Sequence, residues 1–179
     1  MRILVAGASG AIGRQLLPML SAHDVTGTTR SRPGVIATLG ATPLLLDVFD
    51  RDRTIEAVTA ARPEVVVSLL TDLATRDYQA NSRLRREGFP NLAAAAVTAG
   101  ARRLVVESIG FDAGPAGNDA VAAMEGSARG TGLEVVVLRF GLLWGPGTWY
   151  EAPEAGREFI HVRDAAAAVL AAIEGPTPA

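Results

Sequence analysis

The sequence predicts an α/β fold in which one domain is built on a doubly wound parallel sheet. Three observations support this class. Short runs rich in Val, Leu and Ile alternate with longer segments of helical character. The runs show little polar alternation, which is typical of parallel strands covered on both faces. The chain has 179 residues, 49% of them hydrophobic, and this suits a single well-cored domain.

The individual elements follow from this alternation. We expect strands at residues 3–6, 24–28, 43–46, 64–70, 103–107 and 134–139. We expect helices at residues 11–22, 51–61, 77–99 and 118–129. Gly40, Gly100 and Gly132 are each interpreted as following a helix, because glycine is common just past helix ends. Repeated strand–helix units imply right-handed crossovers and helices on both faces of the sheet.

The last part of the chain has a different character. A Gly-Pro-Gly sequence at residues 145–147 closes the sixth strand region, and a largely polar stretch follows it. Residues 159–162 are predicted as a short strand, and Asp164 as the cap of an Ala-rich helix. We therefore expect residues 1–179 to form one domain, with residues 148–179 as a much reduced C-terminal substrate region.

Charge balance and rare residue types exclude several functions. The 17 basic and 19 acidic side chains give a formal net charge of −2, which gives no support for a nucleic-acid or membrane partner. The absence of cysteine excludes disulfides, thiolate metal sites and cysteine nucleophiles. Two distant histidines and no clustered carboxylates predict no metal site. The N-terminus lacks signal-peptide features and no apolar run is long enough to cross a membrane, so we expect a cytoplasmic protein.

Three spaced glycines lie directly after the first strand and directly before the first helix. Gly7 permits a tight turn, Gly10 allows the backbone to approach a phosphate, and Gly13 allows close packing of the helix on the sheet. The helix then offers its free N–H groups and positive dipole end to an anion. This context predicts a binding site for the pyrophosphate of a dinucleotide. The alternative is a glycine turn that serves packing only.

Several motifs together resemble one known family. They are Gly-x-x-Gly-x-x-Gly at residues 7–13, Asp-Val at 47–48, Arg-Glu-Gly at 86–88 with Asn-Leu at 91–92, Arg-Phe-Gly-Leu-Leu-Trp-Gly-Pro-Gly at 139–147, and Phe-Ile-His-Val-Arg-Asp at 159–164. In this order they resemble the extended short-chain dehydrogenase/reductase superfamily, in particular its NAD-dependent epimerase/dehydratase branch. The resemblance covers nearly the whole chain. It implies a Rossmann-like NAD(P)-binding domain.

The resemblance also implies where a nicotinamide cofactor is held. The implied cofactor-binding residues are Gly7, Ser9, Gly10, Ala11, Ile12, Gly13, Asp47, Val48, Leu69, Leu70, Thr71, Phe140, Gly141 and Leu142. The second strand ends without the acid that bonds the ribose 2′-hydroxyl in NAD-preferring members. Arg30 and Arg32 follow it instead, and guanidinium groups suit a 2′-phosphate. We therefore expect NADP rather than NAD, the alternative being two solvated loop arginines.

The usual catalytic pair of this superfamily is missing. Its chemistry uses a Tyr and a Lys four residues apart on one helix, and these positions fall near Gly117 and Val121. The chain contains no lysine at any position, so that mechanism cannot operate within it. The remaining catalytic candidates are Ser108, Glu107 and Asp112 near the end of the fifth strand. Ser108 is alternatively a turn-stabilising hydroxyl, and Glu107 alternatively an exposed acid.

Other side chains near the expected site are less specific. The resemblance implies a structural, backbone-bonded role for His161, and His23 is expected on the far side from the site. Trp144, Trp149 and Tyr150 suit either a pocket for a flat substrate or the anchoring of a loop.

Three functions remain open at this point. The first is an NADP(H)-dependent oxidoreductase that acts on a small carbonyl or sugar/polyketide-like substrate with an unusual proton donor. The second is a non-redox isomerase, cyclase or lyase on the same scaffold. The third is a nucleotide-sensing binding protein. Because the substrate-side segments are short, we expect either an open site or a homodimer in which a second copy covers it.

Overall fold

The computed structural model describes residues 1–72 and 77–176. Six parallel strands form one sheet in the order β3-β2-β1-β4-β5-β6. They are β1 (Arg2–Ala6), β2 (Asp24–Thr29), β3 (Thr42–Leu45), β4 (Val65–Ser68), β5 (Arg103–Ile109) and β6 (Glu134–Phe140). This order confirms the predicted doubly wound α/β fold, because the chain winds outward from β1 on one side and from β4 on the other. Each expected strand is found, with ends shifted by no more than three residues.

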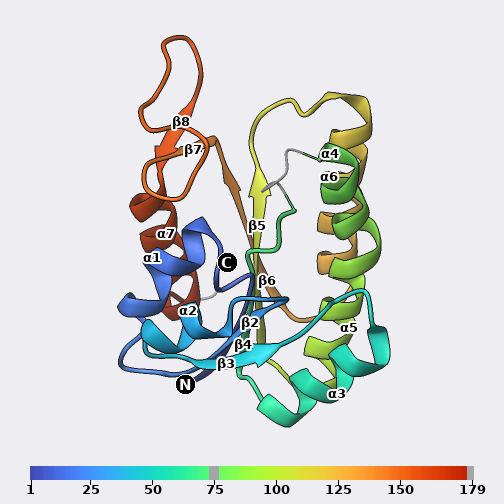
Figure 1. The fold of residues 1–179 in the computed structure, drawn as a ribbon. Coiled ribbons are helices and arrows are strands. Elements are labelled where there is room, and N and C mark those ends of the chain that lie inside the picture. Colours follow the sequence, from blue (N-terminus) through green and yellow to red (C-terminus); the bar gives the residue numbers. More distant parts are fainter. Residues whose placement is uncertain (73–76, 177–179) are drawn as a thin grey trace.

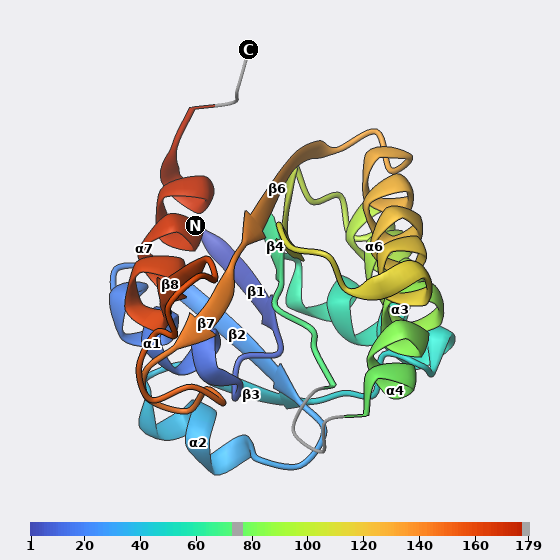
Figure 2. The same cartoon turned by 90° about the horizontal axis from the view of Figure 1, so that it is seen from above.

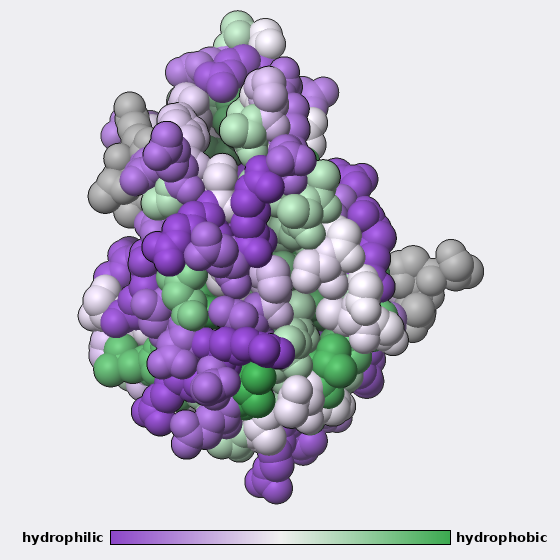
Figure 3. Space-filling model, turned by 90° about the vertical axis from the view of Figure 1, so that its right-hand side faces the viewer, coloured by the Kyte–Doolittle hydropathy of each residue, from purple (hydrophilic) through white to green (hydrophobic). Residues whose placement is uncertain are grey.

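Helices cover both faces of the sheet (Figures 1 and 2). They are α1 (Ala11–Met19), α2 (Pro33–Thr38), α3 (Arg51–Ala61), α4 (Tyr78–Arg83), the π-helical turn η1 (Leu84–Gly88), α5 (Phe89–Thr98), α6 (Gly114–Arg129) and α7 (Val162–Glu174). The core is accordingly split in two. Side chains of α1 and α7 pack with Ile3, Val5 and Val67 on one face, and those of α5 and α6 pack with Leu4 and Val66 on the other. The outer face of the side that carries α5 and α6 mixes hydrophilic and hydrophobic residues without one dominant apolar patch (Figure 3).

Two helical regions differ from the expectation. No bounds were predicted for α2, although Gly40 was expected to follow a helix; the helix begins at Pro33, whose fixed φ suits the first helical position, and Gly40 follows its end with a φ of 86°. Residues 77–99 were expected to form one helix. They instead form α4, η1 and α5, with Asp77 capping the start through the N–H groups of Gln79 and Ala80. The π turn lies just before Pro90, which has no N–H to donate to the preceding turn.

In the C-terminal region, His161 links a short strand to the last helix. Strands β7 (Leu142–Trp144) and β8 (Phe159–His161) form a small parallel sheet beyond β6. The expectation that Asp164 caps the last helix is wrong: His161 is the N-cap of α7, and its Nδ1 accepts a hydrogen bond from the Arg163 N–H. The predicted role of His161 in a backbone hydrogen bond is therefore confirmed. In the described part of the chain, no helix is long and apolar enough to cross a membrane.

Candidate nucleotide site

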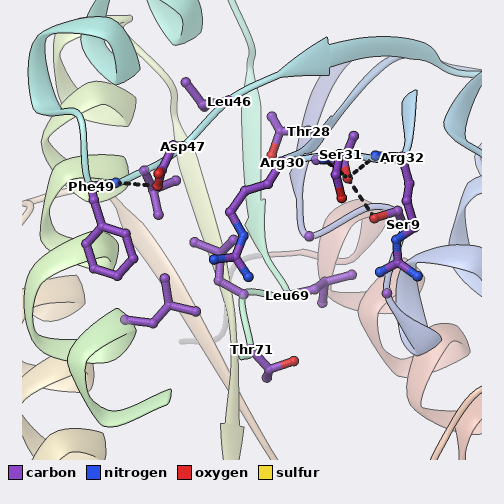
Figure 4. Close-up of a pocket in the computed structure, with 16 residues that line it drawn as sticks. Ser9, Thr28, Arg30, Ser31, Arg32, Leu46, Asp47, Phe49, Leu69 and Thr71 are labelled. Carbon is purple, nitrogen blue, oxygen red and sulfur yellow. Dashed lines mark hydrogen bonds between the residues drawn. The ribbon is translucent and has the colours of Figure 1, made fainter. Parts of the chain in front are cut away.

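The main pocket lies at the carboxyl edge of the sheet, where the chain winding reverses between β1 and β4 (Figure 4). Ligands of doubly wound folds bind at this crevice. Ten of the residues predicted to bind the cofactor line it: Gly7, Ser9, Gly10, Arg30, Arg32, Asp47, Val48, Leu69, Leu70 and Thr71. Thr28, Thr29, Ser31, Leu46, Phe49 and Leu84 complete the lining. Most of these additional residues are sequence neighbours of the predicted ones at the same strand ends.

The glycine turn has the shape that a phosphate cradle requires. Gly7 adopts a φ of 83°, and a Cβ there would clash with the carbonyl group of Leu69. A Cβ on Gly10 would meet only the carbonyl oxygen of Gly7, at 3.1 Å, so the backbone beside it is open to the pocket. Gly10 is also the N-cap of α1 and has no side-chain cap, so the first N–H groups of this helix remain available to an anion. The turn therefore fits the pyrophosphate of a dinucleotide.

Gly13 plays a different part from the one expected. A Cβ there would clash with the backbone of Ala8. The close contact that glycine permits is thus between α1 and the turn itself, rather than between α1 and the sheet.

A buried hydroxyl pair fixes the turn to the end of β2. The hydroxyl groups of Ser9 and Thr29 are hydrogen-bonded at 2.9 Å. The Thr29 oxygen also accepts from the N–H groups of Ser31, at 3.4 Å, and Arg32, at 3.2 Å. Ser9 therefore acts through its hydroxyl on the loop that carries Arg30 and Arg32. The sequence indicated Ser9 through the family resemblance but gave no sign of its partner.

The two loop arginines differ in their surroundings. Arg30 extends across the pocket (Figure 4), and its guanidinium forms an ion pair with Asp72 at 3.1 Å. Asp72 follows the end of β4, and its N–H donates to the buried Asn81 of α4. Arg32 is exposed and lines the same pocket, and its backbone is held by Thr29. Both cations are thus placed at the end of β2, where a ribose 2′-substituent is expected.

Asp47 and Val48 form the wall opposite the glycine turn. One carboxylate oxygen of Asp47 accepts from the Phe49 N–H at 3.1 Å, and the rest of the carboxylate faces the pocket. The carbonyl of the buried Val48 accepts from the side-chain amide of Asn91 in α5. The cap of α3 is Asp50, whose carboxylate accepts from Arg53 N–H. Asp47 is therefore free of the capping role and available to a ligand.

Six predicted cofactor residues lie outside this pocket. Ala11, Ile12 and Gly13 belong to α1, and the Ile12 side chain is buried in the core. Phe140, Gly141 and Leu142 join β6 to β7: Phe140 is buried, a Cβ on Gly141 would meet the Glu158 carbonyl oxygen at 2.7 Å, and Leu142 pairs with Phe159. The geometry gives these side chains a packing role, and their contact with a cofactor stays a prediction.

Ser108 faces away from the pocket. Its hydroxyl, 1% exposed, donates to Glu125 of α6 at 2.7 Å. Glu125 also accepts from Arg139 at 2.9 Å and from Arg129 at 2.8 Å. Hydrogen bonds from Arg139, with further ones from Ser108 and Arg129, lower the pKa of Glu125 to about 2 against the opposing effect of burial. The geometry thus supports the alternative structural role of Ser108 and gives its catalytic assignment no support.

The other two catalytic candidates are also separated. One carboxylate oxygen of Asp112 accepts from the Gly114 N–H and from the Asn118 amide, both at 2.8 Å, which lowers the pKa of Asp112. It organises the exposed loop before α6. Glu107 lies at the carboxyl end of β5, where burial raises its pKa to about 7 and the charge of Arg85 opposes this increase. Glu107 is therefore the candidate acid whose protonation changes near neutral pH.

The remaining aromatic and histidine side chains form packing contacts. His161 packs edge-on against Trp144 with ring centroids 4.6 Å apart, and Tyr150 packs in the same way against Phe159. Trp149 contacts Tyr78 of α4 at 6.3 Å between centroids. His23 pairs with Glu174 at 2.9 Å, at the edge of the sheet opposite the pocket, as expected. No group of three metal-ligating side chains occurs in residues 1–72 and 77–176.

Comparison with known proteins identifies the family. Residues 7–176 match the family described as NAD(P)H-binding, and the chain therefore belongs to it. A Streptomyces protein named 3-diazoavenalumate denitrifying reductase is 37% identical over 220 aligned positions, which cover 97% of this chain and 72% of that protein. Because the 220 positions exceed the 179 residues of this chain, the relative carries segments inside the aligned region that this chain lacks.

Solved structures show the same fold at lower identity. The Bordetella bronchiseptica enzyme WbmH in complex with NAD+ has a TM-score of 0.81 at 20% identity, covering 97% of this chain and 72% of that one. The dTDP-glucose 4,6-dehydratase DesIV of Streptomyces venezuelae, with NAD and TYD bound, has a TM-score of 0.79 at 18% identity, covering 98% and 72%. The chain thus shares the fold of these enzymes and spans 72% of the length of each.

Proposed function

We propose that this chain is an NADPH-dependent reductase whose substrate accepts a hydride without needing a proton from the protein. One observation carries the proposal: the chain has no lysine, and α6 has Gly117 and Val121 where the family resemblance places the catalytic Tyr and Lys. A reductase of this family that lacks the pair is best matched to an acceptor for which the pair is unnecessary. The 37% identity to a protein named as a reductase supports the same class of reaction.

The pocket residues suit the cofactor in this role. When bound, NADPH supplies the hydride. The turn from Gly7 to Gly10 and the start of α1 would hold its pyrophosphate, and Asp47 would accept a hydrogen bond from the adenine amine. Arg30 and Arg32 would pair with the 2′-phosphate, which distinguishes NADPH from NADH.

The name of the Streptomyces relative suggests the kind of acceptor. It describes the reductive removal of nitrogen from a diazo compound. An arenediazonium ion that gains a hydride and releases N2 becomes a neutral arene, so atoms and charge balance without a proton. Reduction of a carbonyl group, by contrast, consumes a proton that a side chain normally delivers. We therefore propose an aryl diazo compound as the substrate class.

An isotope experiment tests the proposal. The purified chain is mixed with NADPH and 4-carboxybenzenediazonium, and NADPH loss is compared with N2 release. We expect equal amounts of both, at a rate well above that of a protein-free control. In D2O the benzoate product should contain no new deuterium, whereas NADPH deuterated at the transferred position should label it once. Deuterium incorporation from D2O would contradict hydride transfer. Tight NADPH binding with no oxidation of this acceptor would instead favour a nucleotide-sensing protein.

A further inference from the structure

Arg85 is a buried arginine without a partner in the described residues. It lies in η1, and 7% of the residue is exposed. None of the described side chains or carbonyl groups forms a hydrogen bond or an ion pair with its guanidinium. Burial lowers the pKa of Arg85, and only the charge of Glu107 opposes this. Because an uncompensated buried charge is costly, such a group is normally retained for a ligand or a charged partner.

Arg103 shows what a structural arginine looks like in the same fold. It is 3% exposed, and one of its nitrogens donates to the carbonyl groups of Ala172, Ile173 and Gly175 at the end of α7. Its other terminal nitrogen forms an ion pair with Glu134. Arg103 is thus held by several contacts, although its Nε is buried without a hydrogen-bond partner. No nitrogen of Arg85 is among the fully buried unpaired atoms of the described residues, so its unpaired guanidinium remains accessible.

That position borders the nucleotide pocket. Leu84, the residue before Arg85, lines the pocket. Asn81, one turn earlier, accepts from the N–H of Asp72 just beyond β4. Because β4 pairs with β5 in the register Ser68 to Val106, Glu107 comes next to Leu69, which also lines the pocket. Arg85 in η1 and Glu107 in β5 are thus neighbours of pocket-lining residues, and no ion pair between them occurs among the described residues.

The neighbouring helix α6 packs against the residue that follows Arg85. Arg86 donates to the Ala116 carbonyl and forms a 2.7 Å ion pair with Asp119, so η1 lies against the first turns of α6. Gly117 lies between these two contacts and has no side chain. The family resemblance places the catalytic tyrosine at this point. Arg85 is thus one residue away from the contact between η1 and this part of α6.

We propose that Arg85 binds a carboxylate group of the substrate. The inference rests on the proposed reductase function and narrows its substrate class to carboxylate-bearing hydride acceptors. A guanidinium group offers two parallel N–H donors to a carboxylate, and such a ligand would pair the donors of Arg85 that have no partner among the described residues. Glu107 does not compete for Arg85 once it is protonated, and it then offers a hydrogen-bond donor to the same ligand.

Two substrates and three variants test the site. The KM values of 4-carboxybenzenediazonium and benzenediazonium are measured for the wild type, Arg85→Gln, Arg85→Lys and Arg86→Gln. We expect Arg85→Gln to raise the KM of the carboxylate substrate about 10- to 100-fold, the range of one charged hydrogen-bonded pair, and to leave that of benzenediazonium unchanged. For Arg85→Lys, which keeps the charge without the paired donors, the KM of the carboxylate substrate should lie between those of the wild type and Arg85→Gln. Arg86→Gln, the adjacent exposed arginine, should change neither. Equal KM changes for both substrates, or none, would overturn the proposal.

A binding measurement separates this inference from the proposed function. Binding of benzoate and of benzamide to the NADP+-loaded protein is measured by calorimetry, without any turnover. Benzoate should bind to the wild type and weaken about 10-fold or more in Arg85→Gln, while benzamide should be unaffected. If diazonium turnover is absent but benzoate binding depends on Arg85, the proposed function fails and the carboxylate site stands. If turnover occurs but benzoate binding is independent of Arg85, the proposed function stands and the carboxylate site is refuted. Should Arg85→Gln not fold, the Arg85→Lys comparison decides.

Discussion

The Ser108 hydroxyl donates its hydrogen bond to Glu125, not to the nucleotide pocket. Ser108 lies in β5, Glu125 in α6, and Arg139, the second main partner of Glu125, in β6. One carboxylate thus joins two strands and the helix that packs on them. The family resemblance expects catalytic side chains on this strand and this helix. In this chain the same positions carry a buried polar network, which fixes α6 over a sheet edge that has no further strand beyond β6 among the described residues.

Glu125→Gln is expected to destabilise the fold by about 2 kcal/mol, because the amide nitrogen cannot accept a hydrogen bond and the buried Ser108 hydroxyl or the half-exposed Arg139 loses its partner. The folded pKa of about 2 lies below the ordinary value of 4.5 for a glutamate. The contribution of Glu125 is therefore fully present above that range and is lost as pH falls toward the folded value. Urea unfolding at neutral and acidic pH measures both effects. Glu56→Gln, which breaks only the exposed pair with Arg53, should change stability by less than about 0.5 kcal/mol. Equal losses in the two variants would contradict this role of Glu125.

Glu107→Gln is expected to remove a pH dependence of stability. Because burial raises the folded pKa of Glu107 to about 7 from the ordinary glutamate value of 4.5, the folded state holds a proton that the unfolded state has lost between these pH values. The free energy of unfolding should therefore fall by at most about 3 kcal/mol as pH rises from about 4.5 to about 7, and should level off above pH 7. The glutamine amide does not titrate, so the stability of the variant lacks this pH dependence. Its stability should match that of the wild type in acid and exceed it above neutral pH. Urea midpoints across this range test the prediction, and parallel pH profiles would contradict it.

The sequence predicted the sheet well because its central strands β1, β4 and β5 are buried and have apolar sequences bounded by turns. The pocket was predicted to the same extent, since the turn at Gly7 and the ends of β2, β3 and β4 follow directly from those strands. Sequence could not show the direction of Ser108, because one residue of strand register decides between the pocket and α6. It indicated the six-residue α2 only through the glycine that follows it, Gly40, and it missed the π turn that contains Arg85. These features depend on contacts between distant segments.

Gly7→Ala is expected to abolish nucleotide binding. A methyl group at this position would clash with the Leu69 carbonyl, and the φ of 83° is unfavourable for any residue with a Cβ. Gly34→Ala is the matched control: a Cβ there meets nothing within 4 Å in helix α2, so stability should stay level or rise by about 0.5–1 kcal/mol. NADPH titration by fluorescence and thermal unfolding of both variants provide the measurements. Unchanged NADPH affinity in Gly7→Ala would show that the turn does not hold the cofactor.

The ion pair between Arg30 and Asp72 sets a specific expectation for cofactor preference. Arg30 must leave Asp72, or share it, before it can pair with a 2′-phosphate, whereas Arg32 has no such constraint among the described residues. Arg32→Ala should therefore weaken NADPH binding about 10-fold or more and leave NADH binding unchanged, because only NADPH carries the phosphate.

Asp72→Asn should have the opposite effect, since it releases Arg30 and removes a negative charge from the pocket edge. We expect NADPH binding to tighten several-fold, with a smaller change for NADH. Asp24→Asn is the control, because this exposed acid lies at the opposite end of β2. Calorimetric titration of each variant with NADPH and NADH at low and high salt separates the direct pairing from general charge effects, which salt screens. If Arg32→Ala weakened both cofactors equally, the arginine would contact the shared part of the dinucleotide, and the expected NADP preference would lose its basis.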